Sequence, residues 1–367
     1  MNQATIFCCG DIFIGEQNVR SILSSKMKKI VQNADISVCN FEGPVNSLGI
    51  KIDKLGPNIQ QAKNSIDIIK DSGFDICVLA NNHIYDYGER GLIATIDQLD
   101  SKNIGHIGAG LNRKDTYKEK IVEINNIKIA FLAYADAEFG CLSSDCSDKS
   151  GYAWLEDRCV LVDIKAIKKQ VDFVIVNVHA GVEEAPLPLP EWRSRYREMC
   201  DAGADVIVGH HPHIPQGFDN YKESLIFYSL GNFYFDYEKY SERKNRTFSV
   251  LLNMVKGKPP TFEFAFHNIT DGVVVYEKDN VLKRYIERIS AYPEKTYQQL
   301  SCIQARSMYE SRYKSLNQAS LKSLVITAAK HLFTMGRYIK KRELLLQHNL
   351  GISSHRYTTV RAIINKE

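Results

Sequence analysis

The sequence predicts an α/β fold, and three observations carry this prediction. Short apolar segments typical of buried strands alternate with amphipathic segments typical of helices. The apolar segments are continuous, as expected for strands that are covered on both faces. Several of them end in a polar motif, and the carboxyl ends of strands are where α/β proteins build their binding sites.

The alternation extends to Asp236. Strands are predicted at 5–9, 36–40, 76–80, 127–134, 173–178, 206–209 and 225–229. Helices are predicted between them at 18–33, 64–72, 88–102, 163–170 and 191–202. If these strands lie in parallel, the polar motifs at their carboxyl ends share one edge of the sheet.

The pattern changes after this point. Segments 247–254, 261–267 and 273–277 read as antiparallel strands that close the domain. From about residue 280 the chain is polar and amphipathic, with a basic helix predicted at 321–346. We therefore expect one domain over 1–280 and a helical C-terminal extension over 281–367. The extension could pack on the domain, dimerise or lie on an anionic membrane, and packing is the simplest of the three.

Composition narrows the class of protein. The 367 residues carry a formal net charge of +4, which gives no reason to expect a nucleic-acid partner. Nine scattered cysteines without paired spacing indicate reduced thiols, although Cys141 and Cys146 lie close enough in sequence to pair under oxidation. The N-terminus has no signal-peptide pattern, and no apolar run is long enough to span a membrane. A cytoplasmic protein is therefore expected, and any attachment to the membrane would be peripheral, through its tail or its partners.

The segment Gly209-His210-His211-Pro212-His213 is the most informative motif. Three histidines follow an apolar strand, and neutral imidazole is a common ligand of zinc and similar cations. The alternative is a surface loop that happens to be rich in histidine.

Other predicted strands end in residues of the same chemical kind. The candidate metal ligands are Asp11, Glu42, Asn82, His179, His211 and His213. Each alone has an ordinary explanation as a turn, cap or loop residue. Their succession at strand ends instead favours a two-metal hydrolytic site with oxygen and nitrogen ligands.

In this order the motifs resemble the CapA family of poly-γ-glutamate capsule biosynthesis proteins, within the calcineurin-like metallophosphoesterase superfamily. The resemblance covers about 4–236 and extends through the strands to about 280. It rests on Gly10-Asp11, NFEGP at 40–44, NNHIYDYGERGL at 81–92 with Thr95, VHAG at 178–181, GADVIVGHHPH at 203–213 and YSLGNFYFD at 228–236. The fold it implies is a four-layer α/β/β/α sandwich.

The resemblance also implies a role for each residue. Asp11 and His213 match ligands of a first metal, and His179, His211 and Asn82 match ligands of a second. Glu42 takes the place of a bridging aspartate. His83 matches a catalytic histidine, which Asp86 would orient, and His210 has no counterpart. One or two divalent ions, manganese, iron or zinc, are implied.

Two departures from the superfamily weaken the first site. Its usual Asp-x-His motif is Asp11-Ile12-Phe13 here, so an imidazole is missing, and Glu42 is one methylene longer than aspartate. We therefore expect the second site to fill before the first. The alternative is that Phe13 packs below the site, and that His210 or Asn232 completes the first set of ligands.

The implied function is a metal-dependent hydrolase-like protein of capsule, poly-γ-glutamate or related polymer biosynthesis. A metal-activated water would attack a phosphoester or an amide-type bond, with His83 as general acid. A non-catalytic, polymer-binding subunit of a capsule synthase or exporter and a small-molecule phosphoesterase are the alternatives. The expected partners are an anionic polymer or phosphoester substrate and membrane proteins of capsule synthesis.

One further cluster of charges lies nearby in the sequence. Glu183 and Glu184 follow His179, and Arg193, Arg195 and Arg197 lie on the next predicted helix. We expect these side chains to form a solvated face rather than to contact an anionic substrate.

Overall fold

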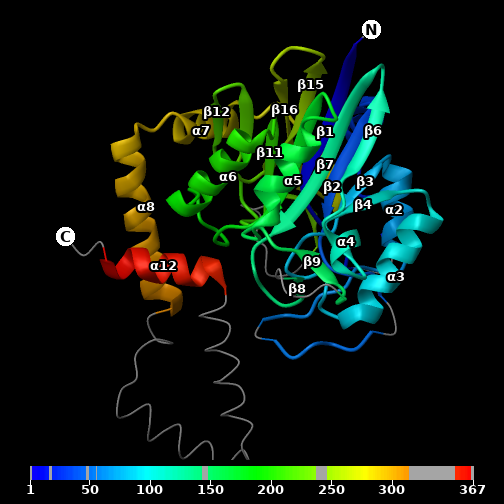
Figure 1. The fold of residues 1–367 in the computed structure, drawn as a ribbon, viewed down its shortest axis with the longest axis horizontal. Helices are drawn as coiled ribbons and strands as arrows, with labels where there is room; N and C mark the ends of the chain where they lie inside the picture. The colour runs from blue at the N-terminus through cyan, green and yellow to red at the C-terminus, as the bar shows by residue number, and fades with distance from the viewer. Residues whose placement is uncertain are drawn as a thin grey trace, which may run out of the picture.

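The fold is known from a computed structural model that describes residues 2–15, 19–46, 49–54, 56–142, 148–236, 246–313 and 352–364. Two large β-sheets lie together at its centre with helices around them (Figure 1). The predicted α/β class is confirmed.

The first sheet combines parallel and antiparallel strands. In spatial order its strands are β17 (Val273–Tyr276), β16 (Thr261–Thr270), β15 (Thr247–Val255), β1 (Gln3–Phe13), β2 (Ile36–Phe41), β3 (Ile76–Val78) and β4 (Gly105–Ile107), with β14 (Asn232–Phe235) beside β1. Strands β1 to β4 are parallel, whereas β15, β16 and β17 are antiparallel, as the sequence predicts.

The second sheet lies alongside the first. In order its strands are β12 (Phe218–Tyr221), β13 (Ser224–Phe227), β11 (Val206–His210), β10 (Phe173–His179), β7 (Ile127–Ala135) and β6 (Lys120–Ile124). A small third sheet consists of β5 (Ala109–Gly110), β9 (Gly151–Ala153) and β8 (Cys141–Leu142). Strand β10 runs parallel to both of its neighbours, β7 and β11.

Side-chain alternation along β7 shows that the second sheet is an inner layer. Ile129 and Phe131 belong to the core shared with the first sheet, whereas Leu132 and Tyr134 belong to a separate core with α5 (Cys159–Ile167) and α6 (Pro190–Ala202). Successive strand residues point to opposite faces, so this sheet has one core on each side. Contact between the rings of Phe227 and Phe262, 4.9 Å apart, joins the two large sheets directly.

The first sheet is covered by helices of its own. The helices are α1 (Ser25–Asn33), α2 (Ser65–Ser72) and α3 (Gly88–Ser101), whereas the short α4 (Arg113–Thr116) contacts β5 and β9 of the third sheet. Met27, Ile69 and Leu99, from the first three of these helices, are buried in the core that contains the strands of the first sheet. This arrangement agrees with the layered fold that the resemblance implied.

Two predicted helix boundaries were wrong. The helix predicted over 18–33 begins only at Ser25, because the Ser24 hydroxyl caps it by accepting a hydrogen bond from the Met27 amide at 3.4 Å. The helix predicted over 163–170 runs from Cys159 to Ile167, because Asp157 accepts from the Cys159 amide at 3.0 Å and starts the helix earlier.

The described part of the C-terminal extension is helical and packs on the domain, which was the preferred expectation. It comprises α7 (Asn280–Ser290), α8 (Glu294–Met308), the π-helix η2 (Tyr309–Tyr313) and α12 (Ser353–Ile364). Helices α8 and α12 cross beside α6 (Figure 1), where the ring of Tyr357 lies 5.4 Å from that of Trp192. The helix predicted over 321–346 lies outside the described residues.

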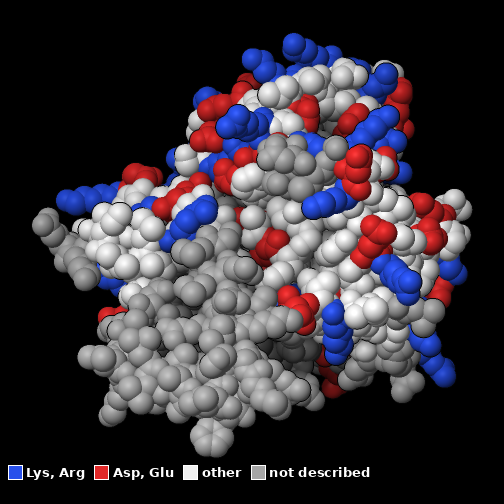
Figure 2. Space-filling view, turned by 60° about the horizontal axis from the view of Figure 1, so that its bottom comes forward, with Lys and Arg blue, Asp and Glu red and all other residues white. Residues whose placement is uncertain are grey.

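The described surface is mixed in charge. Basic and acidic side chains are intermingled over the visible part of one face (Figure 2). Within the described residues, no helix combines the length and the apolarity that crossing a membrane requires. Cys8, Cys9, Cys39 and Cys77 are buried free thiols, and Cys146, the suggested partner of Cys141, lies outside the described residues.

One buried histidine in the first sheet provides a test of this packing. His267 contacts the hydroxyls of Thr247 and Ser249, and burial lowers its pKa to about 3. The unfolded chain, in which the histidine pKa is about 6.5, therefore binds a proton between pH 3 and 6.5 that the folded chain does not. His267 thus favours folding fully above pH 6.5, and that contribution is lost as the pH falls.

Between pH 7 and pH 5, the free energy of unfolding should fall by about 2 kcal/mol less in His267→Gln than in the wild type. Urea denaturation at the two pH values measures the difference, and acid-sensitive groups elsewhere affect both proteins equally. Parallel pH dependences would contradict the assigned environment of His267.

Candidate metal centre

Strand register brings the predicted ligands together. Asp11 lies opposite Asn40 on β2 and Asn232 on β14, while His179 lies opposite His210 on β11. The two groups belong to different sheets, so the expectation of one shared sheet edge was wrong. The strand ends of both sheets meet instead, and the candidate site lies where they meet.

A close backbone approach positions Asp11. A Cβ atom on Gly10 would lie 1.8 Å from the carbonyl oxygen of Gly231, so only glycine fits there. Gly231 itself has a φ of +78°, which favours glycine, and its carbonyl accepts from the Asp11 amide at 3.0 Å. The two glycines thereby place β14 directly against the carboxyl end of β1.

The histidine loop after β11 has an unusual backbone. His211 and His213 have φ values of +94° and +59°, and Pro212 stands between them. Bulky residues rarely adopt this left-handed region, and such strain is concentrated at functional sites. The turn directs both imidazoles inward, and the His211 amide donates to Asp11 Oδ2 at 3.3 Å.

One group of donor atoms surrounds His179. Its Nε2 lies 3.0 Å from Asn82 Oδ1 and 3.1 Å from His211 Nδ1. Ligands about 2.1 Å from one ion, at tetrahedral or octahedral angles, lie about 3.0–3.4 Å apart. The two distances from His179 Nε2 therefore match the spacing of ligands to a single cation.

A second group surrounds Asp11. Asp11 Oδ2 lies 3.3 Å from His213 Nδ1, and His213 Nε2 lies 3.7 Å from Glu42 Oε1. Asp11, Glu42 and His179 each offer one ligand atom within 4.8 Å of the others. Glu42 is therefore close to both groups, where the resemblance implies a bridging carboxylate.

The buried carboxylates require positive charge. Burial would raise the pKa of Asp11, but His210 and His213 lower it well below its ordinary value. Burial raises the pKa of Glu42 well above its ordinary value, although His213 opposes this effect. Burial would lower the pKa of His213, but Glu42 and Asp11 raise it to about 9. The pocket thus retains a proton on His213, and a bound cation would supply the same kind of charge.

The other two imidazoles favour the neutral form that binds metals. Burial lowers the pKa of His211 to about 4 and, together with His211, lowers that of His179 well below its ordinary value. Neutral imidazole is the ligating state. A pair of neutral histidines beside two carboxylates is the donor set that manganese, iron and zinc accept.

Several polar atoms in the centre have no hydrogen-bond partner among the described residues. They include Asn40 Oδ1, Glu42 Oε1 and Nε2 of His210, all on buried side chains. Because unpaired buried polar atoms are unfavourable in a dry interior, these atoms fit a pocket that binds ions or water. The residues present therefore fit the implied divalent cations.

Sequence reasoning missed the role of Asn40. Its Nδ2 donates to Asp11 Oδ1 at 2.8 Å and lies 3.2 Å from His179 Nδ1 and 3.5 Å from Glu42 Oε2. Asn40 therefore joins the carboxylates to His179. Its position in the NFEGP motif was the available signal.

The surroundings of Phe13 agree with the alternative that its ring packs beside the site while other residues complete the first set of ligands. Phe13 belongs to a small buried cluster with Ile59 and Phe235, and the ring of Phe235 lies 4.9 Å from that of His213. Asn232 Oδ1 lies 2.8 Å from His213 Nδ1, and His210 Nδ1 lies 3.4 Å from Asp11 Oδ1. Both residues therefore lie where they could supplement the first set of ligands.

His83 lies at the edge of the centre with a fixed orientation. Its Nδ1 lies 2.7 Å from Asp86 Oδ2, which also accepts from the Ile59 amide at 2.8 Å. Lys54 forms an ion pair with Asp86, and its Nζ lies 3.2 Å from His83 Nδ1. Burial and Lys54 lower the pKa of His83, against the effect of Asp86. Lys54, in an irregular loop, had no sequence signal.

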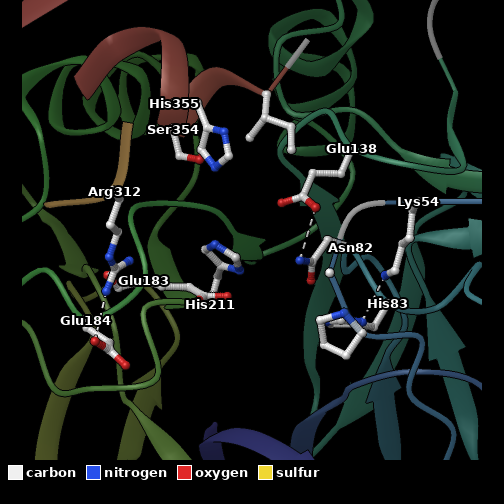
Figure 3. Close-up of a pocket in the computed structure, with 13 residues that line it drawn as sticks. Lys54, Asn82, His83, Glu138, Glu183, Glu184, His211, Arg312, Ser354 and His355 are labelled. Carbon is white, nitrogen blue, oxygen red and sulfur yellow. Dashed lines mark hydrogen bonds and ion pairs between the residues drawn. The ribbon is translucent and has the colours of Figure 1, made fainter. Parts of the chain in front are cut away.

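A cleft of about 420 Å³ opens over the centre. Asn82, His83 and His211 line it, and the amide nitrogen of Asn82 donates to Glu138 at 3.3 Å (Figure 3). This hydrogen bond leaves the amide oxygen of Asn82 facing His179 Nε2, 3.0 Å away. Burial raises the pKa of Glu138 to about 8.

The expectation of a solvated charged face was wrong. Glu183 and Glu184 line the cleft, because the loop after β10 turns back over the centre. On α6, Arg195 is buried against the Leu155 carbonyl, and Arg193 and Arg197 both pair with Asp219. The arginines therefore stabilise the packing of α6.

The fold and the site together define a layered α/β protein with a candidate metal centre where its strand ends meet. The family described as "Bacterial capsule synthesis protein PGA_cap" matches residues 5–237. The chain belongs to this family, as the motifs indicated.

Curated relatives agree with the family assignment. The chain is 34% identical over 247 residues to a "Capsule biosynthesis protein CapA" of Bacillus anthracis, with 63% of this chain and 60% of the relative covered. It is 33% identical over 236 residues to a "PGA biosynthesis protein CapA" of Bacillus subtilis, with 62% of each covered. The match thus spans only about three-fifths of these relatives.

A more distant relative and one solved structure complete the comparison. A "Probable polyglutamine synthesis accessory protein" of Mycobacterium tuberculosis is 24% identical over 221 residues, with 57% of this chain and 58% of the relative covered. An NAD nucleotidase structure from Haemophilus influenzae has a TM-score of 0.41 and 12% identity, with 86% of this chain and 61% of that chain covered.

The geometry predicts that His179→Gln lowers metal content. The imidazole of His179 lies within 3.1 Å of two other candidate ligand atoms. Removing it should weaken metal binding by at least about 10–100-fold, because losing a residue that only hydrogen-bonds to a metal ligand already has an effect of that size. Elemental analysis after dialysis against manganese or zinc measures it. His267→Gln, which removes a buried histidine outside the centre, is the matched control.

Titration of metal-free protein should show unequal binding steps, with the His179 group filling first. Two equally tight steps would show that His210 or Asn232 completes the Asp11 group. Full metal content in His179→Gln would contradict the assigned centre.

Proposed function

We propose that this chain is a metal-dependent hydrolase of capsule, poly-γ-glutamate or related polymer biosynthesis. The observation that carries the proposal is the clustering of six candidate ligands below a cleft that Asn82 and His211 line together with His83, which Asp86 orients. The family assignment supports the polymer context, and the chemistry of the donor set supports hydrolysis.

In this proposal the metal ligands divide between two positions. Asn82, His179 and His211 would hold one cation, and Asp11 and His213 the other, with Glu42 shared between them. Divalent cations in such a pocket supply charge neutralisation to an anionic substrate and lower the pKa of water. Asn40 would keep the carboxylates and His179 in position.

His83 would transfer a proton at the leaving group. Because Asp86 occupies Nδ1, Nε2 is the ring nitrogen left to face a ligand. Asp86 itself is held by Lys54 and the Ile59 amide, so the imidazole cannot rotate freely. A fixed imidazole that lines the cleft supports a role for His83 in general acid–base catalysis.

The alternative is an accessory subunit that binds the polymer without cleaving it. The mycobacterial relative is named as a probable accessory protein of polyglutamine synthesis, which favours this possibility for that relative. Ligand motifs can persist in proteins that only bind, because fold and family do not determine activity. A phosphoesterase acting on small molecules is the remaining option, and both are distinguished by the experiment below.

We expect His83→Ala to lower turnover by about 10²–10⁴-fold while metal content is retained. Activity on a panel of phosphoesters, γ-glutamyl peptides and poly-γ-glutamate, with elemental analysis of the same samples, measures both properties. His106→Ala is the control, because His106 lies on β4 away from the centre.

Three results distinguish the alternatives. Cleavage of phosphoesters alone would identify the small-molecule enzyme. Absence of hydrolysis by wild-type, metal-loaded protein across the panel would reject the hydrolase and favour the accessory subunit. Loss of metal from His83→Ala would assign His83 a structural role.

A further inference from the structure

We propose that the C-terminal helical segment forms the outer wall of the cleft, and that Arg312 and His355 bind an anionic group of the substrate there. The identity of that substrate rests on the proposed function. The binding role of the wall is a separate claim, because it concerns residues beyond 237, where the family match ends.

The cleft has two walls from distant parts of the sequence. Asn82, His83 and Lys54 line one side, and Arg312, Ser354 and His355 line the other, with His211 between them (Figure 3). The first wall carries the candidate metal centre. The second comes from η2 and α12. A substrate bound to the centre therefore lies beside the C-terminal segment.

The wall is anchored to the loop that follows β10. Gln304 of α8 makes two hydrogen bonds to the backbone of Leu187, at 3.0 and 2.8 Å. The Tyr297 hydroxyl, also on α8, donates to the Pro188 carbonyl at 2.7 Å. These contacts hold the extension against the same loop that carries Glu183 and Glu184 into the cleft.

Helix α12 has its own anchor on α6. Arg361 forms an ion pair with Glu191 at 2.7 Å, and both side chains are largely buried. The rings of Tyr357 and Trp192 pack edge to face near this pair. The helix that carries Ser354 and His355 is therefore held in a defined position over the cleft.

Arg312 lies at the junction of the wall and the loop. One guanidinium nitrogen lies 2.8 Å from Glu184 Oε2, and the other donates to the Glu183 carbonyl at 3.1 Å. A guanidinium has five N–H donors, so the two contacts that Arg312 makes among the described residues do not use all of them. Its planar fork suits a carboxylate or a phosphate, and the side chain is 34% exposed.

The shared chemistry of the ligand is an anionic oxygen group. It could be a carboxylate of a glutamyl chain or the phosphate of a phosphoester. The imidazole of His355, from another helix, lines the same cleft. Donors on separate elements favour a ligand that spans the cleft from the metal centre to the wall.

The test is equilibrium binding to the full-length, manganese-loaded protein. One probe is a short γ-glutamyl oligomer labelled with fluorescein, followed by anisotropy, and the other is p-nitrophenyl phosphate as a competitor. Arg312→Gln should weaken one of them by about 10–100-fold, as expected for a lost charge-assisted hydrogen bond. The probe that weakens identifies the anionic group. His355→Gln should weaken the same probe by a smaller factor.

Glu184→Gln is the matched control. It removes the partner charge of Arg312 but keeps the guanidinium, so affinity should be retained or increased if Arg312 contacts the ligand. Equal losses in Arg312→Gln and Glu184→Gln would show that the ion pair only holds the loop. Arg284→Gln, an exposed arginine on α7 outside the cleft, controls for net charge. Arg312→Lys should retain part of the affinity.

The inference is overturned if wild-type protein binds neither probe, or if Arg312→Gln binds both as tightly as the wild type. These outcomes are independent of turnover. Binding that depends on Arg312 in a protein without hydrolase activity would support the wall and reject the proposed hydrolase. Hydrolysis by the wild type, with unchanged ligand binding in Arg312→Gln, would support the proposed hydrolase and reject the binding role of the wall.

Discussion

Two carboxylates that are fully buried among imidazoles set the main physical constraint on this molecule. Asp11 and Glu42 lie where the strand ends of two sheets meet, and water does not solvate their charge there. A buried negative charge is tolerated only with a compensating positive one. His213 provides this charge when it is protonated, and divalent cations would provide it in the proposed function. The interior is therefore organised around binding a cation, at the expense of apolar packing.

This constraint explains local features that ordinary packing does not require. Gly10 and Gly231 permit a backbone approach that any side chain would block, and they bring β14 beside Asp11. The positive φ angles of His211 and His213 are unfavourable for histidine, yet they turn both rings toward the carboxylates. Asn40 then fixes the carboxylates relative to His179. The backbone conformations of His211 and His213 therefore cost stability but produce the arrangement of donor atoms in the candidate centre.

The sequence predicted most of the strands because a buried strand leaves a continuous apolar run, as in 173–178 and 206–209. It also pointed to the histidines and carboxylates of the candidate centre, because these residues follow the predicted strands directly in sequence. It did not predict Lys54, whose role depends on a loop folding back onto Asp86. Nor did it predict that Glu183 and Glu184 line the cleft while Arg195 is buried. A charge pattern in the sequence does not by itself distinguish a solvated face from buried ion pairs.

The origin of the two cleft walls suggests how chemistry and selectivity are divided in this chain. The wall with the candidate metal centre belongs to residues 5–237, which the family shares. The opposite wall belongs to helices outside that match, and contacts such as those of Gln304 and Arg361 hold it in place. Changes in the C-terminal segment can therefore alter what reaches the centre without disturbing the ligands, since no ligand lies on η2 or α12. In the proposed function, the shared domain determines which bond reacts, and the extension determines which substrate carries it.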